Sequence, residues 1–326
     1  MNREDIKRLL KEQPYKIGHF VGFKDLTGLH NDWLRSFLYD PDDQTLLSHR
    51  GSYKTTCLSL FLALHLIEKP RENTLFFRKT DTDVAEVISQ TSKILKTAAL
   101  QRIVYLLYGT YLIFEKDTAN EINTNLNTSS KGASQLVGLG ITTSITGKHA
   151  DIVVTDDIVN IKDRISRAER ERTKTQYMEL QNIVNRGGRF INTGTPWHKE
   201  DAISLMPNVR RFDCYYTGLI TREKLENLRH SMSDSLFAAN YELKHIADTN
   251  AMFKEPKFIS DETLIYGGLA HIDAAYDGED STAFTAFKRQ PDGSLVGIGK
   301  IWRKHVDDCL PEIKAIHQRL LLGSVA

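Results

Sequence analysis

A short run of residues near position 50 has the composition of a phosphate-binding loop. Arg50-Gly51-Ser52-Tyr53-Lys54-Thr55-Thr56 stands between the apolar run Thr45-Leu46-Leu47 and a segment expected to be helical from Cys57 to about Ile67. At a junction of strand, loop and helix, the backbone N–H groups and the helix N-terminus face a bound anion. Lys54 would reach the β- and γ-phosphates of a nucleotide, and the hydroxyl of Thr55 would be a ligand of Mg²⁺.

The loop departs from the usual pattern at two places. Tyr53 stands where a glycine usually precedes the lysine, and the first glycine of the pattern is absent. A plain turn between a strand and a helix, with an exposed lysine, explains the loop alone equally well. A nucleotide site therefore needs a second element.

Two carboxylates at the end of an apolar strand supply that element. Ile152-Val153-Val154-Thr155 is β-branched and is followed directly by Asp156 and Asp157. In a phosphate-loop enzyme the first carboxylate helps to hold Mg²⁺, and the second orients or deprotonates the attacking water. A solvated loop or a helix cap would explain the paired acids by themselves. The loop followed by the acidic strand, in this order along the chain, favours a site for ATP and Mg²⁺. Asp157 and Lys54 would be its catalytic residues.

A third motif ends another predicted strand. Ile191-Asn192-Thr193-Gly194-Thr195-Pro196 passes from apolar residues to small hydroxyl residues and glycine. Such a strand end can sense the γ-phosphate and pass its loss to a moving segment, and we assign this coupling role to Thr193, Gly194 and Thr195. Without the other two motifs, an ordinary exit from a strand into a turn would be the preferred interpretation.

The elements around these motifs alternate between strands and helices. A strand is expected at Thr74–Phe77, a helix over 84–95, strands over 105–123, and a charged helix near 166–185 that Gly187-Gly188 would end. This alternation predicts an α/β fold with a mainly parallel sheet covered on both faces.

Composition narrows the class of protein. The chain has 326 residues, which fits roughly two domains at ~150 residues each. The formal net charge of +1 excludes a protein coated in basic charge, although a local basic groove remains compatible with it. No apolar run is long enough to span a membrane. Three distant cysteines argue against a disulfide framework and for a reducing cytoplasm.

The three motifs, in this order, resemble the large terminase subunit of tailed bacteriophages, a DNA-packaging ATPase. The loop is similar to that family's Arg-Gly-x-x-Lys-Ser/Thr form of the Walker A motif, and Gly147–Asp157 is similar to its Walker B region. Thr193–Asp201 resembles the Gly-Thr-x-Trp-His coupling segment, which is the most specific match. Further similar positions are His30, Trp33 and Leu34 in a lead-in helix, and Phe77-Arg78-Lys79-Thr80 with Asp83.

The resemblance implies three parts. These are a RecA-like P-loop ATPase domain over 1–220, a linker subdomain over 221–262, and the first part of an RNase H-like nuclease domain over 263–326. The nuclease would hold Mg²⁺ or Mn²⁺ between several carboxylates, of which the sequence supplies Asp273 and the weaker candidate Asp280. Because the family's later carboxylates would lie beyond residue 326, we expect an incomplete domain that does not cut DNA, with three antiparallel strands and an exposed edge.

The function that the resemblance implies is ATP-driven translocation of double-stranded viral DNA into a capsid. The implied partners are double-stranded DNA, a portal protein and a small terminase subunit, with copies of the chain forming a ring on the capsid and no membrane. The implied location is the host cytoplasm, with transient attachment to the capsid. Arg50 and Lys148 are candidates for stabilising charge on the phosphates. The mixed-charge helix over 164–174 is expected to be a solvated face rather than a DNA contact.

Two alternatives from other classes stay open. A superfamily-2-type helicase would need a second RecA domain with arginines, whereas residues after 262 predict strands, a hairpin and a helix around Asp273. A packaging or scaffold remnant that binds ATP without hydrolysing it is the other alternative. Tyr53 and the missing carboxylates motivate it, and a phosphate-release assay separates it from an ATPase.

Overall fold

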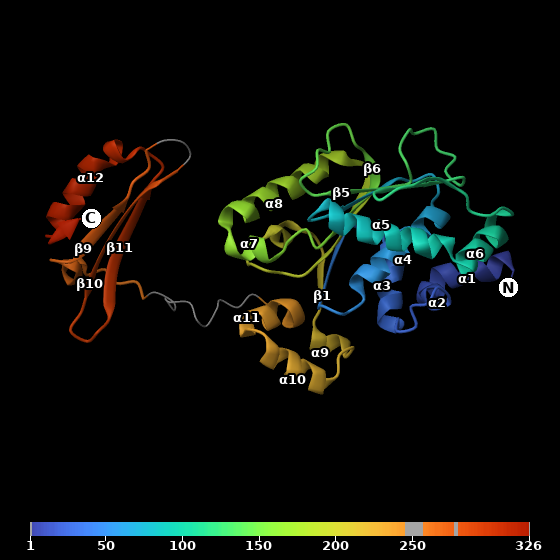
Figure 1. The fold of residues 1–326 in the computed structure, drawn as a ribbon, viewed down its shortest axis with the longest axis horizontal. Coiled ribbons are helices and arrows are strands. Elements are labelled where there is room, and N and C mark those ends of the chain that lie inside the picture. The colour runs from blue at the N-terminus through green and yellow to red at the C-terminus, as the bar shows by residue number, and fades with distance from the viewer. Residues whose placement is uncertain (1, 245–256, 277–279, 326) are drawn as a thin grey trace. The chain divides into compact units, whose positions relative to one another are not determined.

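The computed structural model describes residues 2–244, 257–276 and 280–325. The chain forms two compact units, Met1–Ala251 and Met252–Ala326 (Figure 1). Each unit has its own sheet and its own core, and each is described by itself. Within the described residues, no helix has both the length and the apolar character needed to cross a membrane.

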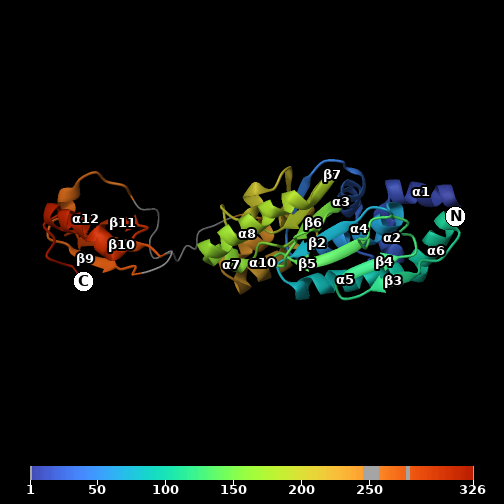
Figure 2. The same ribbon diagram turned by 90° about the horizontal axis from the view of Figure 1, so that it is seen from above.

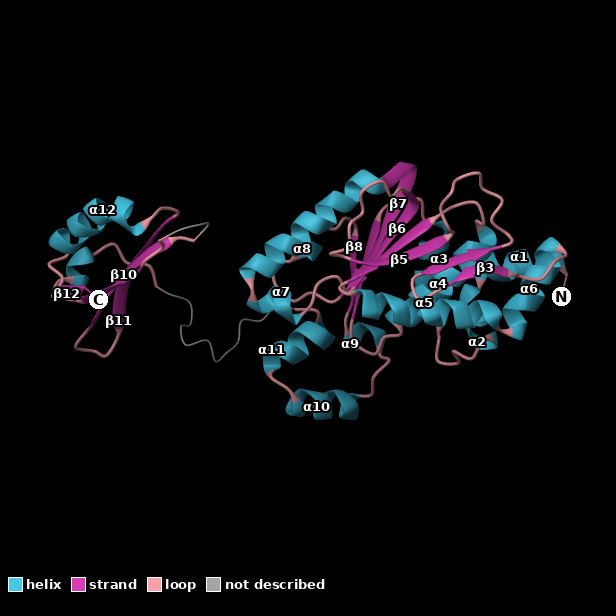
Figure 3. Cartoon of the chain, turned by 45° about the horizontal axis from the view of Figure 1, so that its top comes forward, coloured by secondary structure: helices cyan, strands magenta, loops and turns pink. Residues whose placement is uncertain are grey.

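An eight-stranded sheet organises the first unit, in the order β3-β4-β5-β2-β6-β7-β1-β8 (Figure 3). Every neighbouring pair from β5 to β8 is parallel, and the pairs β3–β4 and β4–β5 are antiparallel. The prediction of a mainly parallel α/β sheet is therefore confirmed. The strands are β1 (Gln44–Ser48), β2 (Thr74–Arg78), β3 (Phe114–Asp117), β4 (Glu121–Thr124), β5 (Leu136–Gly140), β6 (Ala150–Asp156), β7 (Val184–Gly194) and β8 (Val209–Phe212).

Helices cover both faces of this sheet (Figure 2). Neighbouring apolar residues of a strand point to opposite faces, so Leu46 and Val154 join one core cluster, and Leu47 and Val153 join the other. The first cluster packs against α1 (Arg3–Glu12), α2 (Pro14–Phe20), α3 (Gly28–Tyr39), α4 (Lys54–Glu68), α5 (Asp81–Lys96) and α6 (Ala98–Tyr108). The second packs against α8 (Arg167–Glu179), η1 (Leu180–Ile183) and η2 (Ala202–Leu205), with the short α7 (Ile161–Ile165) preceding them.

Two predictions about this unit were wrong in part. Residues 105–108 are the end of α6 rather than a strand, and Gly109 ends that helix with φ of +73°. The charged helix stops at Glu179, and Val184 already begins β7, so Gly187 and Gly188 lie inside a strand. They are tolerated there because β7 bulges: Val184 pairs with Ala150, whereas Arg189 pairs with Ile152.

Short helices follow the sheet of the first unit. They are α9 (Cys214–Thr217), α10 (Arg222–Ser231), α11 (Asp234–Phe237) and the π-helical turn η3 (Ala238–Glu242). Cys214, Leu225, Phe237 and Tyr241 form their small core. The helical character predicted after residue 221 is confirmed up to Glu242, and the irregular stretch predicted around Pro256 falls outside the described residues.

The second unit is a four-stranded sheet in the order β11-β10-β9-β12 with one long helix. Its elements are η4 (Glu262–Ile265), β9 (Leu269–Asp273), β10 (Thr282–Arg289), β11 (Leu295–Trp302), α12 (Val306–Arg319) and β12 (Ser324–Val325). The three predicted antiparallel strands and their helix are confirmed. The expected exposed edge is wrong in part, because the short β12 pairs in parallel with β9 at Leu269 and Ala270 but not at His271–Asp273.

Candidate nucleotide-binding site

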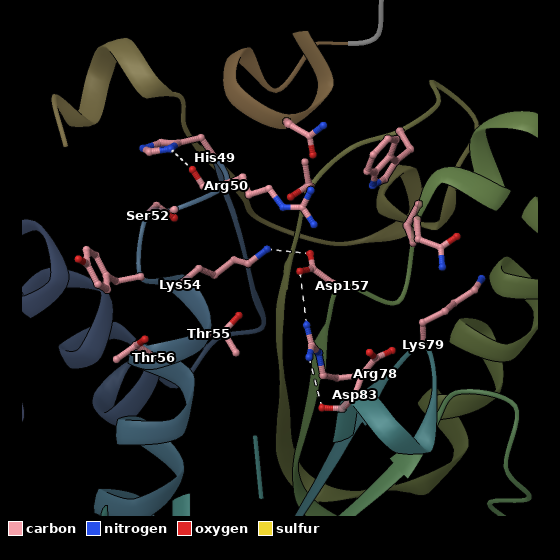
Figure 4. A pocket seen from close by; sticks show the side chains of 17 residues that line it. His49, Arg50, Ser52, Lys54, Thr55, Thr56, Arg78, Lys79, Asp83 and Asp157 are labelled. Carbon is pink, nitrogen blue, oxygen red and sulfur yellow. Dashed lines mark hydrogen bonds and ion pairs between the residues drawn. The ribbon is translucent and has the colours of Figure 1, made fainter. Parts of the chain in front are cut away.

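The carboxyl ends of β1, β2, β6 and β7 meet beside a cavity of about 440 Å³ (Figure 4). Parallel strands end at the same edge of a sheet, and open α/β sheets bind ligands at that edge. The loop over 49–56 forms one wall of the cavity, and side chains from the ends of the neighbouring strands form the others. The other lining residues are Arg78, Lys79, Asp83, Asp157, Val159, Asn160, Thr195, Trp197 and Asn240.

The structure explains how Tyr53 occupies a position where glycine is usual. Its φ of +60° lies in the left-handed region, which costs a side-chain-bearing residue about 1 kcal/mol. Two contacts hold it there: its hydroxyl donates to Asp25 Oδ2 at 2.9 Å, and its ring meets the His30 ring edge-on at 5.9 Å. His30 Nε2 also lies 3.1 Å from the carbonyl oxygen of Ser52. The loop therefore keeps its turn without the glycine.

Further contacts fix the other end of the loop to the helices after β8. The Arg50 backbone N–H donates to the carbonyl oxygen of Asn240 at 2.8 Å. His49 Nε2 lies 2.6 Å from the hydroxyl oxygen of Thr217. Burial lowers the pKa of His49, so its ring is neutral near pH 7. The segment around η3 thus contacts both the loop backbone and the cavity.

Lys54 faces both predicted carboxylates inside the cavity. Its Nζ lies 2.7 Å from Asp157 Oδ1 and 3.9 Å from Asp156 Oδ1. Lys54 is buried as the first residue of α4, and Asp156 is completely buried as the last residue of β6. The structure therefore brings together the loop lysine and the acidic strand end that the sequence indicated separately.

Asp156 has hydroxyl donors on two sides. Thr55 Oγ1 donates to its Oδ2 at 3.3 Å, and Thr193 Oγ1 donates to its Oδ1 at 2.6 Å. Burial, followed by the Asp157 carboxylate, raises the pKa of Asp156, whereas Lys54, Arg78 and Thr193 act in the opposite direction. An oxygen pair such as Thr55 Oγ1 and Asp156 Oδ2 is of the type that Mg²⁺ prefers, so these residues fit that ion.

Arg78 is a site residue that sequence reasoning did not assign. Its Nε lies 3.1 Å from Asp156 Oδ2, and its Nη2 lies 3.7 Å from Asp157 Oδ2. The guanidinium also donates to the carbonyl oxygen of Asp83 at 3.3 Å (Figure 4). The available signal was its position at the end of a predicted strand, but only the strand order places β2 beside β6.

Lys79 is a second cavity residue without an assigned role. Its Nζ lies 3.1 Å from Asp163 Oδ2 and 3.0 Å from Glu169 Oε1, and it donates to the Thr173 hydroxyl at 2.8 Å. Lys79 therefore ties the end of β2 to α7 and α8 instead of presenting a free charge. The Glu169 backbone N–H also donates to the Ser166 hydroxyl at 3.3 Å, which caps the start of α8.

The predicted coupling segment follows the end of β7, the strand that lies between β6 and β1 in the sheet. Thr195 lines the cavity, and the carbonyl oxygen of Thr193 accepts from the Asp157 N–H at 3.1 Å. Buried Asp201 fixes the turn that follows, because its carboxylate accepts from the backbone N–H groups of Trp197 and His198 at 2.8 and 2.9 Å. It accepts from the Ile203 N–H as well, at 3.0 Å.

The remaining residues that the sequence suggested do not join the contacts around Lys54 and the two carboxylates. Arg50 lines the cavity, is exposed, and has no side-chain partner among the described residues, whereas Lys148 is not part of the lining. Asp273 ends β9 and Asp280 precedes β10, and both are exposed. In the described ranges, no group of three or more carboxylate, histidine or cysteine side chains is arranged to hold a metal ion.

Comparison with known proteins gives likeness in structure only. No protein-family model matches the sequence, and no curated protein matches it either. The fold resembles large terminases of several bacteriophages. The HK97 large terminase is 13% identical, with 92% of this chain and 69% of that chain covered and a TM-score of 0.48.

Two more solved structures extend the likeness. The large terminase of a thermophilic bacteriophage, in complex with ADP, is 9% identical over 90% of this chain and 76% of that chain, with a TM-score of 0.42. The ATPase domain of the Thermus phage P74-26 large terminase is 12% identical over 63% of this chain and 89% of that chain, with a TM-score of 0.40. Because these identities and TM-scores are low, we argue the roles of the residues from the geometry of this chain alone.

Proposed function

We propose that the first unit is a P-loop ATPase. The observation that carries this proposal is the convergence of Lys54, Thr55, Asp156 and Asp157 in one cavity, with Lys54 Nζ 2.7 Å from Asp157 Oδ1. A lysine from a loop before a helix, together with two carboxylates at the end of a neighbouring strand, is the set that phosphoryl transfer to water uses. Arg50, Gly51, Ser52, Tyr53 and Thr56 complete the proposed ATP-binding residues.

The same contacts suggest how the chain's residues would act. The triphosphate attracts Lys54 more strongly than one carboxylate does, so Lys54 leaves Asp157 when ATP binds. Asp157 is then free to orient the attacking water and accept its proton. Thr55 and Asp156 would hold Mg²⁺, which neutralises charge on the β- and γ-phosphate oxygens. Arg78 would keep both carboxylates in place during this exchange.

We further propose that this ATPase packages double-stranded viral DNA. The sequence motifs support it, above all Thr193–Asp201, whose likeness to the coupling segment of large terminases covers residues that contact the cavity. The segment touches Asp157 through Thr193, so a change at the γ-phosphate has a direct route out of the site. Portal protein, small terminase subunit and a ring of copies in the host cytoplasm belong to this proposal.

The second unit is, in this proposal, an incomplete part of a metal-dependent endonuclease that does not cut DNA by itself, because the described residues hold no group of three or more potential metal ligands. Its support is the strand order β11-β10-β9-β12, in which Asp273 ends β9 and pairs with Ala283 of β10, whereas β12 pairs with β9 only at Leu269 and Ala270. Asp273 and Asp280 would each supply carboxylate oxygens to Mg²⁺ or Mn²⁺. A plasmid-nicking assay with Mn²⁺ tests this expectation: the chain should not cut, and cutting that disappears in Asp273→Ala would contradict it.

Phosphate release from ATP tests the main proposal. The chain is incubated with ATP and Mg²⁺, with and without double-stranded DNA, beside Lys54→Ala and the control Lys24→Ala, which removes an exposed lysine outside the cavity. We expect the Lys54 variant to lose about 10²-fold or more in rate, as enzymes do when a main charge-stabilising group is removed. No hydrolysis by the unaltered chain would instead favour the non-hydrolysing remnant.

A further inference from the structure

The first unit has a second cavity, of about 360 Å³, that shares no residue with the first. Most of its lining residues precede β1 or β2, or lie near the start of β6 or β7, such as Asp40, Arg71, Asp151 and Arg189. These are the amino ends of strands whose carboxyl ends form the proposed ATP site. The two cavities therefore lie at opposite edges of the sheet.

A bulge in β7 shapes one wall of this second cavity. Residues 185–188 have no opposite residue in the register with β6, because the pairing moves from Val184 opposite Ala150 to Arg189 opposite Ile152. Gly187 has φ of +80°, and a Cβ on Gly188 would lie 2.6 Å from the carbonyl oxygen of Asp151. Bulges of this kind re-aim side chains. Here the bulge places Arg186 and Arg189 on the cavity wall.

The lining carries an excess of positive charge. Its five basic side chains are Lys69, Arg71, Lys131, Arg186 and Arg189, and its three acidic side chains are Asp40, Glu72 and Asp151. Lys131 pairs with Asp151 at 2.9 Å, and Lys69 lies 3.8 Å from Glu72. Over the part of the chain that the structure describes, Arg71 and Arg186 have neither a hydrogen bond nor an ion pair.

Buried polar atoms in the same wall also lack partners. Arg189 Nη2 donates to the carbonyl oxygen of Phe37, but its buried Nη1 has no hydrogen-bond partner among the described residues. His65 is 2% exposed, and neither ring nitrogen forms a hydrogen bond within the described chain. Its nearest carboxylate oxygen, Glu72 Oε2, is 3.5 Å away. Leaving such a donor unpaired costs about 1–3 kcal/mol, and a bound ion or water is a common explanation.

We propose that this second cavity binds a phosphate group through Arg71, Arg186 and Arg189. The guanidinium fork matches phosphate oxygens in pairs, which suits three arginines around one small anion. The phosphate could come from a free polyphosphate or from the backbone of a nucleic acid, and the chemistry of recognition is the same. This inference does not depend on the first cavity binding ATP.

The first arm of the test uses inorganic pyrophosphate and calorimetry. The full chain carries Lys54→Ala throughout, which weakens any phosphate binding in the first cavity. Arg71→Ala/Arg186→Ala is compared with Arg3→Ala/Arg167→Ala, which removes the same charge from exposed positions outside both cavities. If free phosphate is the ligand, the first pair should weaken pyrophosphate binding about 10-fold or more for each arginine, and the control pair should not.

The second arm measures binding of a short fluorescent double-stranded DNA at several salt concentrations. If the backbone is the ligand, Arg71→Ala/Arg186→Ala should flatten the plot of log affinity against log salt by about 0.9 for each lost phosphate contact. Weaker pyrophosphate binding or a flatter salt dependence, with the control pair unchanged, supports the site. The arm that shows the change identifies whether the phosphate comes from a free polyphosphate or from DNA. Unchanged binding of both probes overturns the proposal. Thermal unfolding checks that the variants are folded, and ATP hydrolysis with Lys54 intact should match the unaltered chain.

Discussion

Lys54 has two competing sets of partners at the residue scale. Its Nζ lies 2.7 Å from Asp157 Oδ1, the carboxylate that we propose as the acceptor of a proton from water. Arg78 contacts the same carboxylate, with its Nη2 3.7 Å from Asp157 Oδ2. If Asp157 is the base, as we propose, it can accept a proton only after the lysine has moved to a phosphate. This competition links hydrolysis to the presence of a triphosphate in the cavity.

Replacing Asp157 by asparagine should separate the binding of ATP from its hydrolysis. Asp157→Asn keeps the size of the side chain and still accepts a hydrogen bond from Lys54, so we expect ATP affinity to change little. Hydrolysis should fall about 10²–10⁴-fold, because an amide cannot take a proton from water. Equilibrium binding of a fluorescent ATP analogue and phosphate release measure the two effects. Hydrolysis at the normal rate would show that another residue orients the water.

Because His65 is buried, we expect the free energy of unfolding to depend on pH. Burial, followed by the charges of Arg189 and Lys69, lowers its pKa to about 3, whereas an unfolded histidine has a pKa of about 6.5. Between these values the unfolded chain binds one more proton, so the stability that His65 contributes is lost as the pH falls. From pH 7 to pH 5 the loss is about 2 kcal/mol.

The variant His65→Gln removes that titration. Urea unfolding at pH 7 and pH 5, followed by the exposure of buried Trp33, gives the two free energies of unfolding. The free energy of unfolding should change about 2 kcal/mol less between pH 7 and pH 5 in the variant than in the unaltered chain. An equal difference in both proteins would mean that His65 titrates normally.

At the scale of elements, sequence patterns identified the strands that carry the site but not their order. β1, β2, β6 and β7 contain apolar or β-branched runs, and each was predicted. β5 was not, because its glycines weaken the strand signal, yet a Cβ on Gly138 would lie 2.3 Å from Val84 Cγ1 on α5. Arg78 was missed as a site residue because only the pairing of β2 with β6 brings it to Asp156.

The turn after β7 depends on one buried carboxylate. Asp201→Ala should destabilise the first unit by about 3 kcal/mol, because it leaves the N–H groups of Trp197, His198 and Ile203 without their acceptor. The neighbouring Glu200 is exposed, so Glu200→Ala should stay within about 0.5 kcal/mol. Chemical unfolding gives the free energy of unfolding of both variants. Equal values would mean that the turn does not need Asp201.

At the scale of the whole molecule, the proposed packaging function requires that the proposed ATP site be coupled to movement of DNA. Two segments contact the loop or its partner carboxylates: the strand end at Thr193–Thr195, and the helices near Asn240 and Thr217. Both belong to the first unit, which therefore contains the ATP site and the elements that could respond to it.

Thr195→Val tests that coupling. Valine has nearly the same shape as threonine but no hydroxyl, so the cavity keeps its volume and its lining loses one hydroxyl group. We expect ATP binding and basal hydrolysis to stay within about 3-fold, since a single neutral hydrogen bond contributes about 1 kcal/mol or less, whereas DNA packaging should fail. A packaging assay beside a phosphate-release assay measures both, and normal packaging by the variant would remove Thr195 from the coupling route.

The central claim is that the cavity at the carboxyl ends of β1, β2, β6 and β7 binds ATP through Lys54. A crystal structure of the chain with a non-hydrolysable ATP analogue and Mg²⁺ tests it most directly. We predict that the triphosphate lies against the loop over 50–56, that Lys54 Nζ has moved from Asp157 to the phosphate oxygens, and that Asp157 faces the γ-phosphate. A nucleotide bound elsewhere, or a Lys54 still paired with Asp157 beside a bound triphosphate, would contradict the claim.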